Sequence, residues 1–397
     1  MDPASDRAAP ATPPAGRKSV GEIVARLLLL LLLLYGFLVA IETMSKAIKA
    51  LTDSGMLGGG GDNAQLFGGV SNPFAGLALG VLFTVLVQSS STTTATIVAV
   101  VGSGSLSVEQ AVPMILGANI GTTITNTLVS VGHVRQRQEF FRAFSAATVH
   151  DAFNLMMVAV MLPLEVLTGV LSRTAKALSN SLGTSGGADL DSPVKSAVKA
   201  GHHGVEWVLE SAGLEGNVLG WVALATGIAL TLVCLLRITD NMRRLMAGSI
   251  EQAVNRTLEG SALIGVGIGV VLTIAVQSSS VTTSLLVPMC AAGVMRLENA
   301  FPIMLGANIG TTVTALLASM AQDNPDALTI ALVHLLFNTT GVMACMVFPP
   351  IRSIPLWVAR WLAARALESK FWVIGYVVGV FILIPAFGWW LWGGAGD

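Results

Sequence analysis

The chain has 397 residues, of which 53% are hydrophobic and only 11% are charged. A soluble protein carries roughly 25% charged residues, so this composition excludes an ordinary water-soluble domain. The formal net charge of −1 argues against a nucleic-acid partner, because binding to a phosphate backbone needs an excess of lysine and arginine. Apolar runs of about 18 or more residues recur along the chain, and each is long enough to cross a membrane as a helix. We therefore predict an all-α polytopic membrane protein.

The N-terminal region, residues 1–25, is rich in Pro and Ala, and we expect it to be disordered and cytoplasmic. Arg17, Lys18 and Arg26 precede the leucine run at 27–34, which is the order found in a secretory signal peptide. The apolar stretch continues well beyond that run, however, and no small-residue cleavage motif follows closely. The run is therefore predicted to be an uncleaved first helix.

Two blocks of sequence occur twice. GVLFTVLVQSSSTTT at 80–94 recurs as GVVLTIAVQSSSVTT at 269–283, and PMILGANIGTTIT at 113–125 recurs as PIMLGANIGTTVT at 302–314. Both pairs are 189 positions apart, so no gap separates the two alignments. A shorter motif, HDAFN, reappears further on as HLLFN. The chain is therefore predicted to be a duplicated unit.

The charges that follow each repeated block predict the orientation of the two halves. The segment at 132–142 carries three arginines and one glutamate, whereas the equivalent segment at 321–327 carries two aspartates and no cation. By the positive-inside rule the first segment faces the cytoplasm and the second faces outward. Equivalent segments on opposite sides indicate two inverted-topology repeats, which is the signature of many secondary transporters.

This pattern divides the chain into regions. The first transport repeat is expected at 26–171, an extracytoplasmic loop at 172–215, the second transport repeat at 216–349 and a C-terminal region at 350–397. Arginines that follow a predicted helix at 217–236 fit a cytoplasmic linker between the halves. The three cysteines all lie in or beside apolar segments, so they are interpreted as small core residues.

The C-terminal region is predicted to hold two different helices. The segment at 351–370 combines an aromatic and aliphatic face with four cationic residues, which is typical of a helix lying in the membrane interface. A transmembrane helix follows it. The side of the membrane on which the chain ends is left open.

The stretch VLVQSSSTTTATIV at 85–98 places a glutamine and six consecutive hydroxyl residues in an apolar region. Hydroxyls in membrane helices usually serve packing or bond back to their own backbone. Two copies at identical spacing from a second polar block favour a binding site instead. Pro113 and Pro302, with the glycines of the two GANIGTT segments, predict interrupted helices and re-entrant hairpins at matching positions, which point to a site near the membrane midplane.

The residue types in these blocks indicate an anion bound together with small cations. Hydroxyls, carboxamides, backbone N–H groups and helix N-termini suit an oxyanion such as phosphate. Hydroxyl and carbonyl oxygens can also coordinate a hard cation such as sodium. Neither block contains Lys or Arg, so an anion held in low dielectric needs mobile counter-charge. The residues thus predict a cation-coupled anion transporter without a cofactor.

The paired Q-S-S-S motifs, each followed by G-A-N-I-G-T, and the stretch ATVHDAFN at 147–154 resemble the type II sodium–phosphate cotransporters. The resemblance covers roughly residues 25–350. It implies a sodium-coupled symporter that imports inorganic phosphate by alternating access, with sodium as the coupling ion. It also implies a multi-pass protein of the cell inner membrane or plasma membrane, with a cytoplasmic N-terminus and with both Q-S-S-S segments at the membrane centre.

The resemblance further implies the site residues. Those that would contact phosphate are Ser89, Ser90, Ser91, Ser278 and Ser279. Those that would bind one sodium ion are Gln277, Ser278, Ser280, Thr311 and Thr314. Asp151 and Asn154 match the position linked in this family to an additional sodium ion and to electrogenic transport. Further candidates are Gln88, Asn119, Thr122, Thr123, Asn308 and Thr312, and no metal other than sodium is expected.

The sequence departs from the animal members of that family in three respects. Ala118 and Ala307 stand where those members usually have serine, so these side chains contribute no hydroxyl. The loop at 172–215 contains neither a cysteine nor an N-x-S/T sequon. These departures favour a bacterial source.

Other functions are considered beside this one. The nearest is a carrier of another oxyanion, and a regulatory or structural membrane protein is a further possibility. The adjacent His150 and Asp151 suggest a membrane-bound hydrolase as an alternative, but no nucleophile-elbow motif accompanies the pair. His202 and His203 are placed in a polar loop without clustered carboxylates, which disfavours a metal site there.

Overall fold

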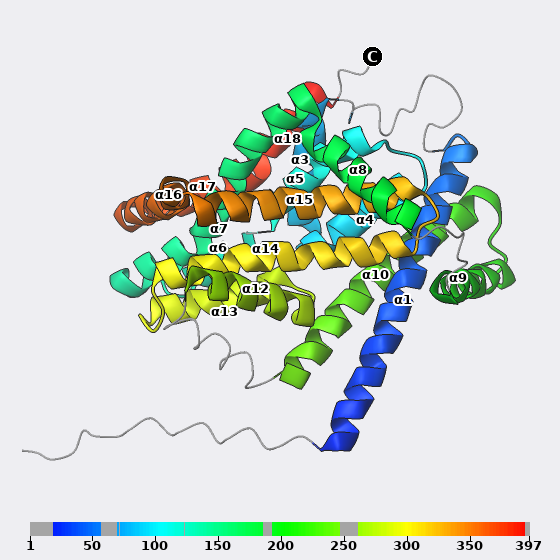
Figure 1. Ribbon diagram of the computed structural model, residues 1–397, viewed down its shortest axis with the longest axis horizontal. Coiled ribbons are helices and arrows are strands. Elements are labelled where there is room, and N and C mark those ends of the chain that lie inside the picture. Colours follow the sequence, from blue (N-terminus) through cyan, green and yellow to red (C-terminus); the bar gives the residue numbers. More distant parts are fainter. Residues whose placement is uncertain are drawn as a thin grey trace, which may run out of the picture.

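The computed structural model describes residues 19–56, 70, 72–122, 124–185, 193–246 and 261–393, with the side chains of 183–185 left out. These residues form helices and, in the part of the chain described, no strand (Figure 1). The helices are α1 (Val20–Asp53), α3 (Pro73–Val87), α4 (Ser90–Gly102), α5 (Val108–Gly121), α6 (Ile124–Val131), α7 (Arg137–Thr168), α8 (Val170–Ser185), α9 (Pro193–Ser211), α10 (Gly216–Met246), α12 (Ala262–Val276), α13 (Ser279–Ala291), α14 (Leu297–Met320), α15 (Pro325–Val347), α16 (Pro349–Glu368), α17 (Phe371–Val378), the π-helical turn η3 (Gly379–Leu383) and α18 (Ile384–Trp392).

Seven helical stretches among the described residues are long and apolar enough to cross a membrane; five are single helices, and two combine consecutive elements, α5 with α6 and α17 with η3 and α18. Four shorter apolar helices, α3, α4, α12 and α13, have 13 to 15 residues each, which is too short for a full crossing. The prediction of an all-α polytopic membrane protein is confirmed.

The short helices form two hairpins, α3–α4 and α12–α13, and the first arm of each hairpin packs on the helix that carries the GANIG residues of the following GANIGTT segment. Gly80 of α3 lies against α5, where an added Cβ would be 2.1 Å from the carbonyl oxygen of Met114. Gly269 of α12 lies against α14 in the same way, with Ile303 O at 2.0 Å. Only glycine permits backbones to approach this closely. The two contacts are again 189 positions apart, so the duplicated sequence packs as a duplicated structure.

The predicted helix interruptions are only partly present. In the first half, α5 ends at Gly121 and α6 begins at Ile124; Thr123 lies outside the described residues. In the second half, α14 runs without interruption from Leu297 to Met320, so the prediction of a break there is wrong. Pro113 and Pro302 lie inside α5 and α14 and end neither helix. Each is the sixth residue of its helix, just beyond the four N–H groups that have no intrahelical partner, so it removes one backbone bond; in α14 the oxygen freed by Pro302, Glu298 O, accepts a hydrogen bond from Arg352 instead (3.0 Å).

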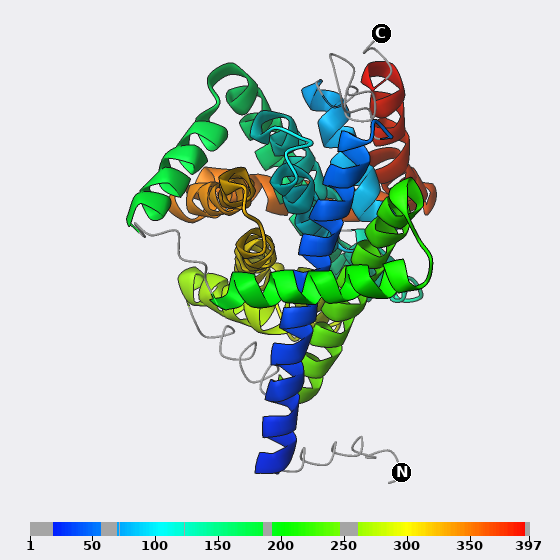
Figure 2. The same cartoon turned by 90° about the vertical axis from the view of Figure 1, so that its right-hand side faces the viewer.

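The central helices α14 and α15 run side by side, with α12 and α13 against α14 (Figure 1). At one edge α1 packs along α10, and α9 crosses α1 (Figure 2). The segment at 172–215, described above as a polar loop, contains most of α8 and all of α9. Helix α1 begins at Val20, before the boundary expected at residue 26, because Ser19 caps it by accepting a hydrogen bond from the backbone N of Glu22 (3.2 Å). Residues 1–18 lie outside the described part.

His202 and His203 belong to α9, so their placement in a loop is wrong. Their ring nitrogens lie within 4.8 Å of each other and of a Glu206 carboxylate oxygen. A carboxylate therefore lies close to both histidines, which the sequence analysis had not expected. His202 is buried, and Thr43 lies 3.3 Å from its Nδ1. Burial lowers the pKa of His202 from its ordinary value.

Candidate functional site

The two Q-S-S-S motifs form the same tight turn between the arms of their hairpins. Gln88 and Gln277 end α3 and α12 in the left-handed conformation, each with φ of 56°. Ser89 and Ser278 then cap α4 and α13, and their hydroxyls accept hydrogen bonds from backbone N–H groups one turn on. A left-handed residue is costly for a non-glycine side chain, so its presence in both copies marks a constrained site.

The tips of both hairpins border one cavity of about 400 Å³. Eight predicted site residues line it: Gln88, Ser89, Ser90, Ser91, Gln277, Ser278, Ser279 and Ser280. All five serines expected to contact phosphate are among them. Ser90, Ser91 and Ser279 are buried. Residues that are 189 positions apart in sequence therefore meet in one site.

Because Ser90 and Ser279 begin α4 and α13, the N-termini of both helices border this cavity. The first N–H groups of a helix lack partners inside it and carry partial positive charge. Two such ends, with the serine hydroxyls, form a neutral set of donors suited to a tetrahedral oxyanion.

Each glutamine is held by a threonine from the following GANIGTT helix region. Thr314 of α14 donates a hydrogen bond to Gln277 Oε1 at 3.0 Å, and Thr125 of α6 donates one to Gln88 Oε1 at 3.2 Å. Thr314 and Gln277 were expected together. Thr125 was missed, although it is the repeat counterpart of Thr314 and the aligned blocks could have revealed it. Thr311 lies one turn before Thr314 on α14 and donates to Ala307 O at 2.9 Å.

Among the residues that the structure describes, several other predicted site residues do not line this cavity. Thr122 and Thr312 donate to backbone oxygens of their own helix regions, Ala118 O and Ile309 O. Thr123 cannot be placed, since it lies outside the described residues.

A buried network of amides joins four helices beside the site. Asn154 Nδ2 of α7 donates to Asn119 O of α5 (2.8 Å), and Asn308 Nδ2 of α14 donates to Asn154 Oδ1 (2.8 Å). Asn338 Nδ2 of α15 donates to Asn119 Oδ1 (3.2 Å), and a ring nitrogen of His150 bonds Asn308 Oδ1. Three predicted residues, Asn119, Asn154 and Asn308, are thus brought together. Asn338 was missed as a site residue, although it is the last residue of the repeated HLLFN motif.

Asp151 lies on α7 between these amides and the C-terminal helices. It is 1% exposed, and its Oδ2 accepts a hydrogen bond from the hydroxyl of Tyr376 on α17 at 2.7 Å. The ring of Tyr376 packs edge-on against Phe144 and Phe381. Nothing in the sequence pointed to Tyr376, since 225 positions separate it from Asp151. Neither Asp151 nor Asn154 is among the residues that line the cavity.

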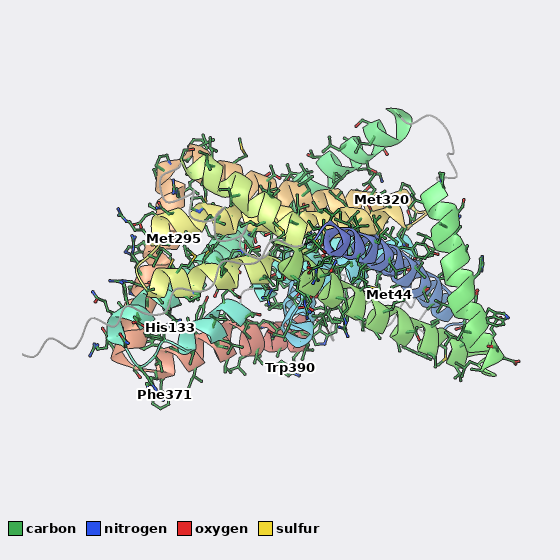
Figure 3. All side chains as sticks on the ribbon, turned by 90° about the horizontal axis from the view of Figure 1, so that it is seen from below. Met44, His133, Met295, Met320, Phe371 and Trp390 are labelled. Carbon is green, nitrogen blue, oxygen red and sulfur yellow. The ribbon has the colours of Figure 1, made fainter. Side chains whose placement is uncertain are left out.

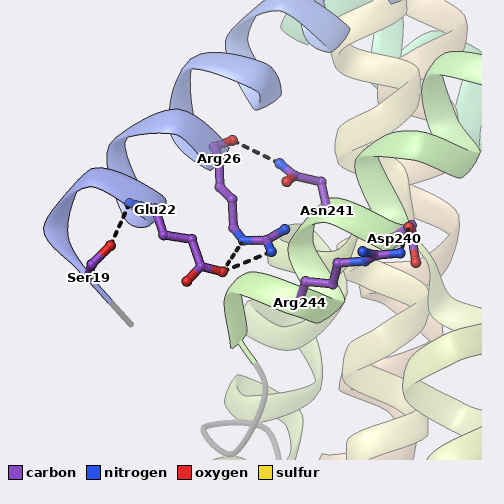
Figure 4. A network of polar contacts seen from close by, with 6 residues as sticks. All are labelled: Ser19, Glu22, Arg26, Asp240, Asn241 and Arg244. Carbon is purple, nitrogen blue, oxygen red and sulfur yellow. Dashed lines mark hydrogen bonds and ion pairs between the residues drawn. The ribbon is translucent and has the colours of Figure 1, made fainter. Parts of the chain in front are cut away.

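Helix α10 forms the remaining wall of the cavity and was not predicted to do so. Thr239, Asp240 and Arg243 line it together with leucines of the same helix. Asp240 is paired with Arg244 (3.1 Å), and Asn241 Nδ2 donates to Arg26 O of α1 at 2.8 Å (Figure 4). The Asn241 bond holds the end of α10 against the start of α1, whereas the Asp240–Arg244 pair lies within α10. The cavity therefore has one cationic side chain, Arg243, at its edge although neither repeated block contains a cation.

Residues from the two halves also bond directly. Asn126 of α6 is 1% exposed, and its Oδ1 accepts hydrogen bonds from Thr283 (3.0 Å) and Ser284 (3.1 Å) of α13. This contact joins the first repeat to the hairpin of the second. The repeat comparison could not reveal it, because the counterpart of Asn126 is Ala315.

Comparison with known proteins identifies the family of the chain. The family model described as Na+/Pi-cotransporter matches residues 36–184 and 223–355. Sodium-dependent phosphate transport protein 2A of Ovis aries is 31% identical over 93% of this chain and 68% of its own length. The 2A protein of Rattus norvegicus is 31% identical over 92% and 68%, and the 2B protein of Homo sapiens is 32% identical over 91% and 64%. No solved structure matches the chain. On the extent of these matches, the chain belongs to the Na+/Pi-cotransporter family.

Proposed function

We propose that this protein is a sodium-coupled phosphate cotransporter of the cell membrane that imports inorganic phosphate by alternating access. The observation that carries the proposal is that both Q-S-S-S tips line one cavity. The family membership and the names of the relatives support it. Phosphate and sodium are then the transported partners, and sodium is the coupling ion rather than a resident cofactor.

The phosphate site would be formed by the five serines of the two tips. Their hydroxyls and the two helix N-termini donate hydrogen bonds to phosphate oxygens but supply no full positive charge. Arg243 would attract the anion at the edge of the cavity. Full compensation of a divalent anion in low dielectric still needs cations, and sodium ions that enter with the anion provide them. This shared need couples the two fluxes.

One sodium site would use Gln277, Ser278, Ser280, Thr311 and Thr314. The hydrogen bond between Thr314 and Gln277 supports this grouping, because it brings oxygen atoms of α12 and α14 together. Sodium would be coordinated by these neutral oxygens. A further sodium ion would be bound by Asp151 and Asn154, whose side chains are buried on adjacent turns of α7.

Phosphate uptake into proteoliposomes tests the proposed function. We expect accumulation of radiolabelled phosphate with an inward sodium gradient and little without it. Competition by sulfate or arsenate would reveal a carrier of another oxyanion. Turnover of an ester in detergent without any flux would indicate a hydrolase instead, and the absence of flux in sealed vesicles would leave a structural or regulatory role.

We also propose that the two repeats have inverted topology. The three arginines at 132–142 and the two aspartates at 321–327 support this by the positive-inside rule. Single cysteines at Gln136 and Asp323, both exposed, should therefore react with an impermeant maleimide from opposite sides of the membrane. The native cysteines, all buried, are replaced beforehand. Reaction of both positions from the same side would contradict the inversion.

Tyr376→Phe should weaken sodium activation. The change removes only the hydroxyl that orients the Asp151 carboxylate and keeps the ring that packs on Phe144 and Phe381. Because one hydrogen bond to a charged group is lost, we expect the half-saturating sodium concentration for phosphate uptake to rise about tenfold. Tyr35→Phe is the matched control, since its hydroxyl bonds Ala197 O of α9 (2.9 Å). An unchanged or lower sodium requirement in Tyr376→Phe would show that Tyr376 does not position Asp151.

A further inference from the structure

A second cavity, of about 360 Å³, lies between the first turns of α7, the turn from α13 into α14, and α16. Its lining includes Arg142 and Ser145 of α7, Gly293 in the turn after α13, Arg296 and Glu298 at the start of α14, and Arg360 of α16. None of these residues has a part in the proposed transport sites. The cavity is therefore a separate feature of the fold.

The charge of this cavity is positive. Three guanidinium groups line it, and the one carboxylate, Glu298, is shared: Arg360 hydrogen-bonds it, and Arg296 Nε lies 3.7 Å from it. Arg352 also donates to the backbone oxygen of Glu298 at 3.0 Å, which fixes the start of α14 against α16. For Arg142, no ion pair is found among the described residues. The three guanidinium groups of the lining therefore carry more positive charge than the Glu298 carboxylate neutralises.

The geometry around Arg142 leaves its guanidinium close to the main chain. Gly293 has φ of 76°, and a Cβ added there would lie 2.4 Å from Arg142 Nη1. The backbone conformation favours glycine here, and the short distance shows that the Arg142 guanidinium lies directly against this turn. This packing directs the Arg142 side chain from α7 toward the start of α14.

Ser145 adds a polar group that lacks a partner. It lies one turn after Arg142 on the same face of α7, it is 2% exposed, and its Oγ has no hydrogen-bond partner in the described structure. Buried hydroxyls are nearly always hydrogen-bonded, because an unpaired one loses its water without compensation. An acceptor atom bound in the cavity would satisfy it.

Helix α14 also begins at this cavity. Its N-cap residue, Arg296, makes no side-chain capping bond, and the helix continues for 24 residues. The Glu298 carboxylate already bonds its own backbone N–H in this turn, so the remaining first N–H groups and the dipole add the rest of the attraction for an anion. The arginines, the hydroxyl and the helix end all favour an acceptor-rich, negatively charged group.

We propose that this cavity binds a phosphate group, carried by an anionic phospholipid or present as free inorganic phosphate. Arginine forks bind phosphate oxygens in pairs, and Ser145 would donate to a further oxygen. The lipid source is favoured by the surroundings. Trp357 and Trp361 of α16 are 64% and 42% exposed, as expected for aromatic side chains at a membrane interface. Met295 of the cavity and Phe371 lie at the same end of the molecule (Figure 3).

The test measures phosphatidylglycerol retained by the full chain after extraction from mixed phosphatidylglycerol and phosphatidylcholine vesicles, using native mass spectrometry. We expect at least one bound phosphatidylglycerol, and about tenfold less in the double variant Arg142→Gln with Arg296→Gln. Ser145→Ala should lower retention in the same direction. Arg365→Gln is the control, because Arg365 is an exposed arginine of α16, pairs with Glu368 (2.9 Å) and does not line the cavity.

A second arm measures binding of radiolabelled inorganic phosphate in phosphatidylcholine vesicles, in the Ser90→Ala background, which weakens binding at the transport cavity. Retention of lipid that inorganic phosphate does not displace identifies the lipid as the ligand. Phosphate binding that depends on Arg142 and Arg296 identifies free phosphate. Equal behaviour of the wild type and the double variant in both arms would overturn the proposal. Because binding is measured without transport, loss of flux in the Ser90→Ala protein does not affect this test.

Discussion

Ser90→Ala and Ser279→Ala are each expected to abolish or severely reduce sodium-dependent phosphate uptake. Both serines are buried, and both begin helices whose N-termini border the same cavity. Each substitution removes a hydroxyl that would donate to a charged oxygen in low dielectric. A hydrogen bond to a charged group contributes about 1.5–3 kcal/mol, so a loss of roughly tenfold to more than a hundredfold in phosphate affinity is expected from either change.

The measurement is initial uptake over a range of phosphate concentrations, with the amount of folded protein in the vesicles determined in parallel. Ser103→Ala is the matched control: Ser103 caps the opposite end of α4, and its hydroxyl bonds Val100 O (2.7 Å). The control should transport normally. If either Ser90→Ala or Ser279→Ala also transports normally, that half of the molecule has a packing role and the shared site is wrong.

The second large effect concerns membrane potential. Divalent phosphate with two sodium ions is neutral, so a third sodium ion bound at Asp151 would make each cycle carry one positive charge inward. A potential of 100 mV then adds about 2.3 kcal/mol of driving force, which corresponds to roughly fifty-fold more accumulation. A carboxylate suits this third ion, because neutral oxygens alone compensate an additional desolvated cation poorly.

Asp151→Asn should therefore keep sodium-dependent uptake but remove its response to potential. Asparagine has the shape of aspartate and can still accept the hydrogen bond of Tyr376, so packing on α7 is preserved. Uptake is measured in liposomes clamped with potassium and valinomycin at zero and at inside-negative potential. Asp326→Asn, in the first turn of α15, is the carboxylate control. A wild type that ignores potential, or an Asp151→Asn variant that still responds to it, would exclude Asp151 as the cause of charge movement.

These expectations depend on sequence and structure to different degrees. The membrane class, the duplication and the serine tips could all be read from the chain. The apolar runs set the helices, and each Q-S-S-S turn follows from residues within a few positions of it: a left-handed glutamine and then a serine that caps the next helix. Because the local sequence is nearly the same in both repeats, these local preferences form the same turn in each.

The end of α5 at Gly121, compared with the uninterrupted α14, shows where local sequence stops being sufficient. GANIGTTIT and GANIGTTVT differ in one position, yet the first region contains a helix end at Gly121 whereas the second lies within the uninterrupted α14. Nearly identical residues cannot account for two outcomes by intrinsic propensity. Packing against different neighbours decides between them, and Asn126, whose bonds to α13 have no counterpart in the second half, is one such difference.

By itself, the sequence determined the helical membrane fold, the two matching hairpins and the serines at their tips, because apolar length, helix capping and turn conformation act over short stretches of chain. Only the tertiary structure decided that both tips border one cavity, that α10 closes it with Arg243 at its edge, and that Tyr376 reaches Asp151 across 225 positions. It also decided which arginines gather around Ser145. These contacts depend on how whole helices pack, and no spacing within the chain specifies which distant side chains will meet.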